Sequence, residues 1–377
     1  MIKRISSQLI SGRLDKGIAI LLFGPRQTGK TTLLHQLLDE KHDVLWLNGD
    51  ETDVQQLFEN ASSTRLKSVF GNNKTIVLDE AQRIANVGLA MKLITDQICD
   101  VQLVATGSSA LELANRTQEP LTGRKWTFFL YPLSFGEMVA HHGLLQEKRL
   151  LPQRLVYGCY PEIINNPGKE REILKQLTDS FLYKDILMME GLNKPSKLIT
   201  LLQALAYQTG NEVSYNELGR ITGLDNQTVE KYIDLLEKTY VIFRVGALCR
   251  NLRKELKRSR KIYFYDNGIR NALIAQFGSI ELRPDKEALW ENYLMAERRK
   301  YLEYNEMWVN SYFWRTQDQQ EIDYVEEQDG IFSTWEFKWN PDARVRLSKT
   351  FANAYPHSVF KVITPQNVED FLINSST

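Results

Sequence analysis

The sequence is poor in cysteine, in net charge and in long apolar runs. Of its 377 residues 3 are cysteines, and Cys99, Cys159 and Cys249 are widely spaced and outside any metal-ligand pattern. This usage argues against a disulfide scaffold or a zinc site and suits a reducing compartment. The formal net charge is zero, so any contact with nucleic acid must use a local patch. No apolar run approaches bilayer length and no signal-like segment begins the chain, so we expect a cytoplasmic protein with no membrane partner.

The chain does contain a complete phosphate-binding loop. An apolar run at 18–23 precedes the pattern G-x-x-x-x-G-K-[ST], and a helix-like run at 32–38 follows it. This setting predicts binding of ATP and Mg²⁺, because glycines let several N–H groups face one anion and the helix directs its positive end at the phosphates. Lys30 would reach the β- and γ-phosphates, and Thr31 would ligate Mg²⁺. The alternative is a Gly-rich turn before an ordinary helix. The residues expected to contact the nucleotide are Gly24, Pro25, Arg26, Gln27, Thr28, Gly29, Lys30, Thr31 and Thr32.

A second segment bears on hydrolysis. Residues 74–78 are typical of a short buried strand, which ends in Asp79 and Glu80. In phosphate-loop enzymes the first such acid holds Mg²⁺ and an adjacent one activates the attacking water, so we expect Asp79 and Glu80 in these roles. Alternatively, both acids only cap the following helix, expected at 85–99.

Further candidates for the same site follow a third expected strand near 101–106. Thr106, Ser108 or Ser109 could hydrogen-bond the γ-phosphate, and Ser108 is our choice for a nucleotide contact. Turn formation or helix capping explains these hydroxyls equally well. Arg124 is the best placed arginine for stabilising transition-state charge, although most loop arginines are simply solvated.

Changes of pattern along the chain predict four parts. Strand and helix signals alternate up to about residue 130, which predicts an α/β P-loop NTPase domain at 1–132, a parallel sheet with helices on both faces. Helical signals at 133–194, including 135–142, 153–156 and 170–189, predict a lid or linker. Residues 195–260 predict a winged-helix domain, and 261–377 an α/β domain that ends the chain.

The expected winged helix has mixed charge. Helices are expected at 198–208, 215–222 and 226–239, and a strand at 241–245. The third helix offers side chains that can touch bases or phosphates: Asn226, Gln227, Thr228, Lys231 and Tyr232. The same helix carries acids that would repel a phosphate backbone: Glu230, Asp234 and Glu237. A DNA reader and a protein-packing module therefore fit equally well.

The densest basic stretch runs from Arg250 to Lys261. Its seven cations could contact several DNA phosphates, although such a run is often only a solvated face. Its members are Arg250, Arg253, Lys254, Lys257, Arg258, Arg260 and Lys261.

A possible second active site lies near the C-terminus. Strands expected at 320–325 and 334–339 carry Asp323, Glu336 and Lys338, with the spacing D-x(12)-E-x-K. Asp323 and Glu336 could hold Mg²⁺ while Lys338 orients a water against a phosphodiester, and Glu291 could add a ligand from a helix. This is the PD-(D/E)XK pattern of restriction-endonuclease-like folds. The pattern is short, and a fold can retain such residues without using them.

Together these residues resemble the AAA-type ATPases of bacteria and archaea whose second half is an uncharacterised domain ending in a restriction-endonuclease-like fold. The resemblance covers almost the whole chain and implies an ATP-binding core, a winged-helix middle and a nuclease-like end. Cys159 departs from the sequence pattern of that family, in which a second glycine or another small residue is common at this position. The resemblance rests on residues 24–31, Leu-Asp-Glu-Ala-Gln at 78–82, 106–109, 123–124, Tyr-Pro-Leu-Ser-Phe at 131–135, 158–162, 264–268, and the trio Asp323, Glu336 and Lys338.

Two functions from different classes fit the sequence. In one, ATP hydrolysis drives a machine that grips or cuts DNA. In the other, the protein is a nucleotide-dependent switch whose C-terminal domains bind proteins and cleave nothing. A homo-oligomer, with arginines acting between subunits, is compatible with both.

Overall fold

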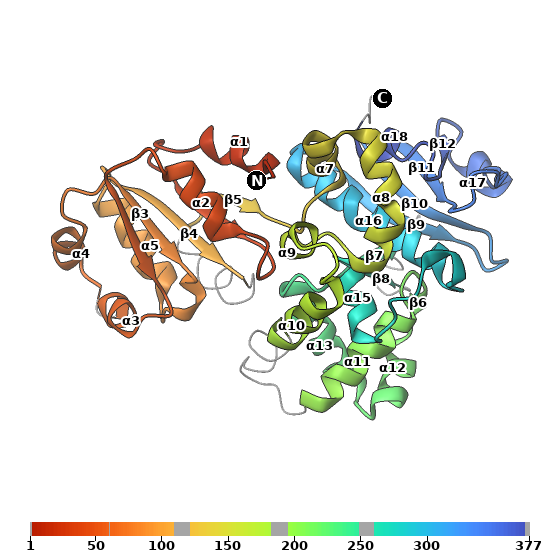
Figure 1. Cartoon of the computed structure of the whole chain (residues 1–377), viewed down its shortest axis with the longest axis horizontal. Helices are drawn as coiled ribbons and strands as arrows, with labels where there is room; N and C mark the ends of the chain where they lie inside the picture. The colour runs from red at the N-terminus through yellow and green to blue at the C-terminus, as the bar shows by residue number, and fades with distance from the viewer. Residues whose placement is uncertain (1, 60, 109–120, 182–194, 249–259, 374–377) are drawn as a thin grey trace. The chain divides into compact units, whose positions relative to one another are not determined.

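The chain forms two compact units (Figure 1). The first comprises Met1–Pro132 with Lys238–Tyr240, and the second comprises Leu133–Glu237 with Val241–Thr377. No helix in the described ranges is long and apolar enough to cross a membrane. The computed structural model describes residues 2–59, 61–108, 121–181, 195–248 and 260–373.

The first unit is built on a five-stranded parallel sheet with the order β2-β3-β4-β1-β5. Aliphatic residues fill the central strands, where both faces of the sheet are buried. The sheet and its flanking helices form the α/β fold that the sequence predicts. Its strands are β1 (Ala19–Phe23), β2 (Val44–Asn48), β3 (Thr75–Asp79), β4 (Gln102–Gly107) and β5 (Lys125–Phe129).

Five α-helices and one 3-10 turn accompany this sheet in the described part of the first unit. They are α1 (Ile5–Ser11), α2 (Lys30–Leu38), α3 (Thr52–Glu59), α4 (Ser63–Phe70), η1 (Ala81–Arg83) and α5 (Val87–Gln97). Ile10 of α1 and Leu34 of α2 pack in one apolar core with Ile20 and Leu22 of β1. Helix α5 contacts α3, α4 and β4. The helix expected at 85–99 is therefore present as α5, with η1 as an additional turn before it.

The second unit is built on a seven-stranded mixed sheet with the order β12-β11-β10-β9-β7-β8-β6. Strand β7 pairs antiparallel with β8 and parallel with β9. Strands from the expected winged helix and from the expected C-terminal domain thus share one sheet. The strands are β6 (Glu212–Val213), β7 (Ile242–Ala247), β8 (Arg260–Phe264), β9 (Asn310–Arg315), β10 (Glu321–Gln328), β11 (Ile331–Phe337) and β12 (Val359–Ile363).

The helices of the second unit form one body with this sheet. Helices α10 to α13 and α15 share an apolar core with β7 and β8, while α16 is buried along most of its length and contacts β8 and β11 (Figure 1). The helix expected at 153–156 is the end of α8, and the one expected at 170–189 is described as far as Phe181. The helices are α7 (Phe135–His142), α8 (Leu144–Tyr157), α9 (Pro161–Asn165), α10 (Glu170–Phe181), α11 (Pro195–Tyr207), α12 (Tyr215–Thr222), α13 (Asn226–Lys238), α15 (Asn267–Leu273), α16 (Lys286–Tyr304), α17 (Lys349–Ala354) and α18 (Glu369–Leu372).

Parts of three segments that the sequence identifies mainly by resemblance meet inside the second unit, where Leu133, Cys159 and Asp266 are linked. The Leu133 N–H donates to the Cys159 carbonyl at 2.9 Å, and the Cys159 N–H donates to Asp266 Oδ2 at 2.7 Å. Gly158 is obligatory here, because its φ is +74° and a Cβ would lie 2.0 Å from Asp266 Oδ1. Burial raises the pKa of the Asp266 carboxyl. Residues 133–135, 158–160 and 264–268 therefore form one buried junction.

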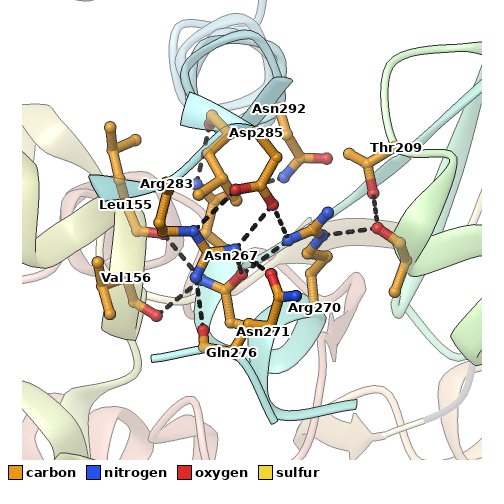
Figure 2. Close-up of polar contacts among 12 residues, drawn as sticks. Leu155, Val156, Thr209, Asn267, Arg270, Asn271, Gln276, Arg283, Asp285 and Asn292 are labelled. Atoms are coloured by element: carbon orange, nitrogen blue, oxygen red, sulfur yellow. Dashed lines mark hydrogen bonds and ion pairs between the residues drawn. The ribbon is translucent and has the colours of Figure 1, made fainter. Parts of the chain in front are cut away.

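A buried polar network continues from this junction along α15 (Figure 2). Arg270 Nη1 and Arg283 Nη2 donate to Asp285 Oδ2 at 2.7 and 2.8 Å. Both guanidinium groups also contact the Asn271 side-chain oxygen, and the Asn271 amide donates to two carbonyls near the end of α8. Burial alone would raise the pKa of Asp285, but the hydrogen bonds from Arg283 and Arg270 outweigh it and lower the pKa to about 2.

Candidate functional site

The phosphate-binding loop joins β1 to α2 and is held by its own side chains. Gly29, with φ +89°, caps α2, and Lys30 is the first residue of that helix. The Lys30 ammonium is 6% exposed and donates to the carbonyls of Gly24 and Pro25, both at 2.8 Å. Thr28 Oγ1 donates to the Pro25 carbonyl at 2.9 Å. The carbonyls of Gly24 and Pro25 therefore hold the Lys30 ammonium within the loop, which the sequence predicts to bind the phosphates.

Gly24 is required by a close approach of two backbones. Its φ is +151°, and a Cβ there would lie 2.1 Å from the Leu130 carbonyl oxygen. Arg4, which the sequence analysis missed, reinforces the same region: its buried guanidinium donates to the carbonyls of Thr28 at 2.8 Å and Tyr131 at 2.6 Å. No local motif marks Arg4, because its two acceptors are distant in sequence.

Asp79 lies at the carboxyl end of β3, beside the start of α2. Asp79 Oδ2 accepts a hydrogen bond from Thr31 Oγ1 at 2.9 Å, and Oδ1 accepts one from Thr106 Oγ1. Thr106 is fully buried and its oxygen also accepts from the Glu80 N–H at 3.1 Å. Its hydroxyl therefore contacts both acids, and a role as a γ-phosphate sensor stays a prediction.

Glu80 leaves the strand in a left-handed conformation, with φ +50° and ψ +40°. Its side chain contacts Gln82 and Ser108, whereas the Asp79 side chain contacts Thr31 and Thr106. Gln82 Nε2 donates to Glu80 Oε2 at 2.5 Å and to Ser108 Oγ at 3.0 Å. Ser108, expected to contact the nucleotide, thus contacts Glu80 and Gln82; Ser109 lies outside the described residues.

These groups fit ATP and Mg²⁺ chemically. The Thr31 hydroxyl and the Asp79 carboxylate are hard oxygen ligands of the kind that Mg²⁺ prefers, and they already contact each other. Lys30 and the start of α2 supply positive charge for phosphates. Glu80 makes its side-chain contacts with other partners, Gln82 and Ser108.

The structure does not bring Arg124 to the phosphate-binding loop of its own chain. Its carbonyl accepts from the Ala19 N–H, at the start of β1, whereas the loop follows the other end of that strand. A strand of this length separates the two edges by about 16 Å. The Arg124 side chain instead pairs with Asp96, with Nε 3.0 Å from Oδ1. Arg124 therefore does not lie where we expected a catalytic arginine that acts within its own subunit.

Asp323, Glu336 and Lys338 come together in the second unit. Asp323 and Glu336 lie on the paired strands β10 and β11, next to the partners Tyr324 and Trp335. Lys338 Nζ is 3.0 Å from Glu336 Oε2 and 3.7 Å from Asp323 Oδ2. The alternation of these strands thus places the side chains together as the sequence predicts.

Glu291 of α16 belongs to a neighbouring buried ion pair. Its Oε1 accepts from Lys261 Nζ at 3.0 Å and from the Tyr263 hydroxyl at 2.7 Å. Burial, with Asp323 nearby, raises the pKa values of both Glu291 and Glu336 to about 7. In the described ranges no group of three or more His, Cys, Asp or Glu side chains is spaced to hold a metal ion.

The expected DNA-contacting residues are only partly placed. In α13, Asn226, Gln227 and Lys231 are exposed, but Tyr232 is 2% exposed and belongs to the core, which corrects its expected position on the surface. Of the basic stretch, residues 249–259 lie outside the described part of the chain. Lys261 is buried against Glu291 and Glu321, so it does not belong to a surface patch.

Comparisons with known proteins assign a family model to most of the first unit. Residues 16–139 match the family model described as "AAA domain". Residues 148–279 and 286–373 match two models described as domains of unknown function, DUF8612 and DUF4143. An uncharacterized protein of Mycobacterium tuberculosis is 27% identical over 87% of this chain and 74% of its own length. One of Haemophilus influenzae is 27% identical over 70% of this chain and 71% of its own length.

Among solved structures, the Walker-type ATPase of Pyrococcus abyssi is similar to this chain, with a TM-score of 0.50 and 15% identity. The match covers 73% of this chain and 96% of that one, and at this identity it speaks for the fold alone. These comparisons support the prediction of an AAA-type P-loop domain at residues 16–139. The winged-helix and restriction-endonuclease-like assignments stay predictions.

Proposed function

We propose that the first unit binds ATP with Mg²⁺ and hydrolyses it. The observation that carries this proposal is the arrangement of two adjacent acids: Asp79 is hydrogen-bonded to Thr31 of the loop, while Glu80 is hydrogen-bonded to Gln82 and Ser108. A ligand carboxylate and a separate base are the two acidic groups that hydrolysis of a phosphoanhydride requires.

Each residue has a distinct task in this proposal. Thr31 and Asp79 hold Mg²⁺, which neutralises charge on the phosphates when it is bound. Lys30 exchanges the carbonyls of Gly24 and Pro25 for phosphate oxygens. Glu80 takes a proton from the attacking water. The water oxygen bonds to the γ-phosphorus, the bond from phosphorus to the leaving oxygen breaks, and ADP and phosphate result.

Two substitutions separate binding from chemistry. Lys30→Ala should weaken ATP binding measured by calorimetry, whereas Glu80→Gln should bind ATP with near wild-type affinity and lose at least about 100-fold in kcat. If the wild type releases no heat with ATP and Mg²⁺, the proposal is wrong. If Glu80→Gln hydrolysed ATP at the wild-type rate, a group other than Glu80 would have to be the general base.

For the second unit we propose that ATP turnover is coupled to an action on DNA. The element order β6-α12-α13-β7-β8 is that expected of a winged helix, and Lys338 lies between two carboxylates, as a PD-(D/E)XK nuclease would need. Neutralising Arg253, Lys254, Lys257 and Arg258 should abolish a retarded DNA band at low salt. If the wild-type protein never retards DNA, the result favours the alternative, a nucleotide-dependent switch that binds proteins.

The oligomeric state has its own test. Measuring the mass of the protein in solution with and without ATP shows whether it forms a homo-oligomer.

The nuclease part has its own test. Asp323→Asn and Lys338→Met should abolish Mg²⁺-dependent nicking of plasmid DNA while ATP turnover persists. Glu327→Gln is the matched control, because Glu327 lies on the same strand but contacts Asn310 instead of the cluster. If the wild type does not nick DNA under any of several divalent metals, the nuclease assignment falls and the ATPase proposal stands.

A further inference from the structure

In the described part of the chain, the hydrogen bonds to the Glu80 carboxylate fall on one oxygen. Oε2 faces two donors: Gln82 Nε2 at 2.5 Å and the Ser108 hydroxyl at 3.5 Å. Among the described residues, no hydrogen bond to Glu80 Oε1 is found. Gln82 and Ser108 are 5% and 3% exposed, whereas Glu80 is half-buried. The side of the carboxylate that Gln82 and Ser108 contact is therefore enclosed.

The backbone around Glu80 leaves this support little freedom. The Glu80 N–H donates to Thr106 Oγ1 at 3.1 Å, and its carbonyl accepts from the Arg83 N–H at 3.0 Å. A Cβ at Gly49 would lie 2.4 Å from the Glu80 carbonyl oxygen, so a second backbone also packs against the turn. Gln82 lies in this turn and reaches across to Ser108, just after β4.

We propose that Gln82 is a positioning residue for ATP hydrolysis, a role that rests on the proposed function of Glu80. Its amide fixes Oε2, so that Oε1 is the atom that receives the proton of the attacking water. A general base must meet its proton within hydrogen-bond reach and in a defined direction, and misplacement by about 1 Å can cost about 100-fold in rate. Ser108 completes the support through its contacts with Gln82 and Glu80, instead of binding the γ-phosphate directly.

The test is Gln82→Met, which keeps the length of the side chain and removes the donor. We expect an ATP affinity within about threefold of wild type and a kcat reduced by about 10- to 100-fold. In the Glu80→Gln background the same substitution should change kcat by less than about twofold, because the group that Gln82 positions is already disabled. Ser108→Ala should leave the ratio of ATP to ADP affinity unchanged.

Gln102→Met is a matched control. Gln102 is also 5% exposed in the first unit, and its amide also makes two hydrogen bonds, to the carbonyls of Ile18 at 2.8 Å and Leu103 at 3.0 Å. These contacts lie near the start of β1 and β4, away from the loop. We expect Gln102→Met to lower the melting temperature as much as Gln82→Met does and to keep kcat within about threefold.

Three results would overturn the role of Gln82. They are a wild-type kcat in Gln82→Met, an equal loss in Gln102→Met, and an equal fold-loss of Gln82→Met in the wild-type and Glu80→Gln backgrounds. Failure of the ATPase proposal itself is recognised separately, by the absence of turnover in the wild type or by unchanged turnover in Glu80→Gln.

Discussion

Replacing Asp285 by Asn should destabilise the second unit strongly. Asp285 is the carboxylate shared by Arg270 and Arg283, whose side chains are 3% and 5% exposed. The amide removes the negative charge and leaves two guanidinium groups buried together. The substitution changes the shape of the side chain very little, so the effect reports charge and hydrogen bonding instead of packing.

Two routes give the size of the effect. The pKa of Asp285 falls from 3.8 to about 2 in the folded state, and each pKa unit corresponds to about 1.4 kcal/mol, so the charged form contributes about 2.5 kcal/mol. Removing one partner of a buried ion pair costs about 3–5 kcal/mol in other proteins. For a unit of this size, about 1 kcal/mol lowers the melting temperature by about 2–4 °C, so we expect a fall of about 5–20 °C.

Thermal unfolding followed by calorimetry measures this change. Glu212→Gln is the control, because Glu212 pairs with a single, more exposed arginine, Arg315, and should cost less than about 1 kcal/mol. Because the pKa of Asp285 is lower in the folded state, its charged form stabilises the fold at pH values above the unfolded pKa of 3.8. The loss of stability in Asp285→Asn, relative to wild type, should therefore shrink as the pH falls from about 3.8 to about 2. A melting temperature within about 2 °C of wild type near neutral pH would refute the reasoning.

Three further predictions concern the two sites. Gly24→Ala should weaken ATP binding by about tenfold or more in calorimetry, because its Cβ would overlap the Leu130 carbonyl and displace the loop. Thr31→Ala should bind ATP equally with and without Mg²⁺ in a titration, because it removes the hydroxyl ligand beside Asp79. The folded pKa of Glu336, about 7, lies above its ordinary value of 4.5, so the stability that protonation supplies is complete below about pH 4.5 and is lost as the pH rises through about 7. Glu336→Gln, neutral throughout, should therefore raise the melting temperature more at pH 8 than at pH 5.

The sequence predicts best what depends on neighbouring residues. The loop and the pair Asp79 and Glu80 are recognisable because their spacing is local. The role of Gln82 is not, because it depends on the end of β4 lying beside the turn after β3. Arg124 was misplaced because it precedes β5, and in a parallel sheet the beginning of a strand lies at the edge opposite the phosphates. The position of Arg124 in the sequence does not show at which of the two edges of the sheet its side chain lies.

The same limit applies to charge and burial in the second unit. Tyr232 was expected on the exposed face of its helix but fills the core, and Lys261 was counted in a surface patch although two acids enclose it. Both depend on contacts with distant elements. Asp323, Glu336 and Lys338 were brought together correctly, because strand alternation and the pairing of adjacent strands fix their faces.

The position of β7 between β8 and β9 constrains how this protein can be divided during evolution. The two family models of the C-terminal half meet near residues 279 and 286, between the strands that flank β7. Recombination at that point would separate β9 from β7 and expose a row of unpaired backbone groups. Either segment expressed without the other would therefore lack part of its sheet, and we expect it to aggregate.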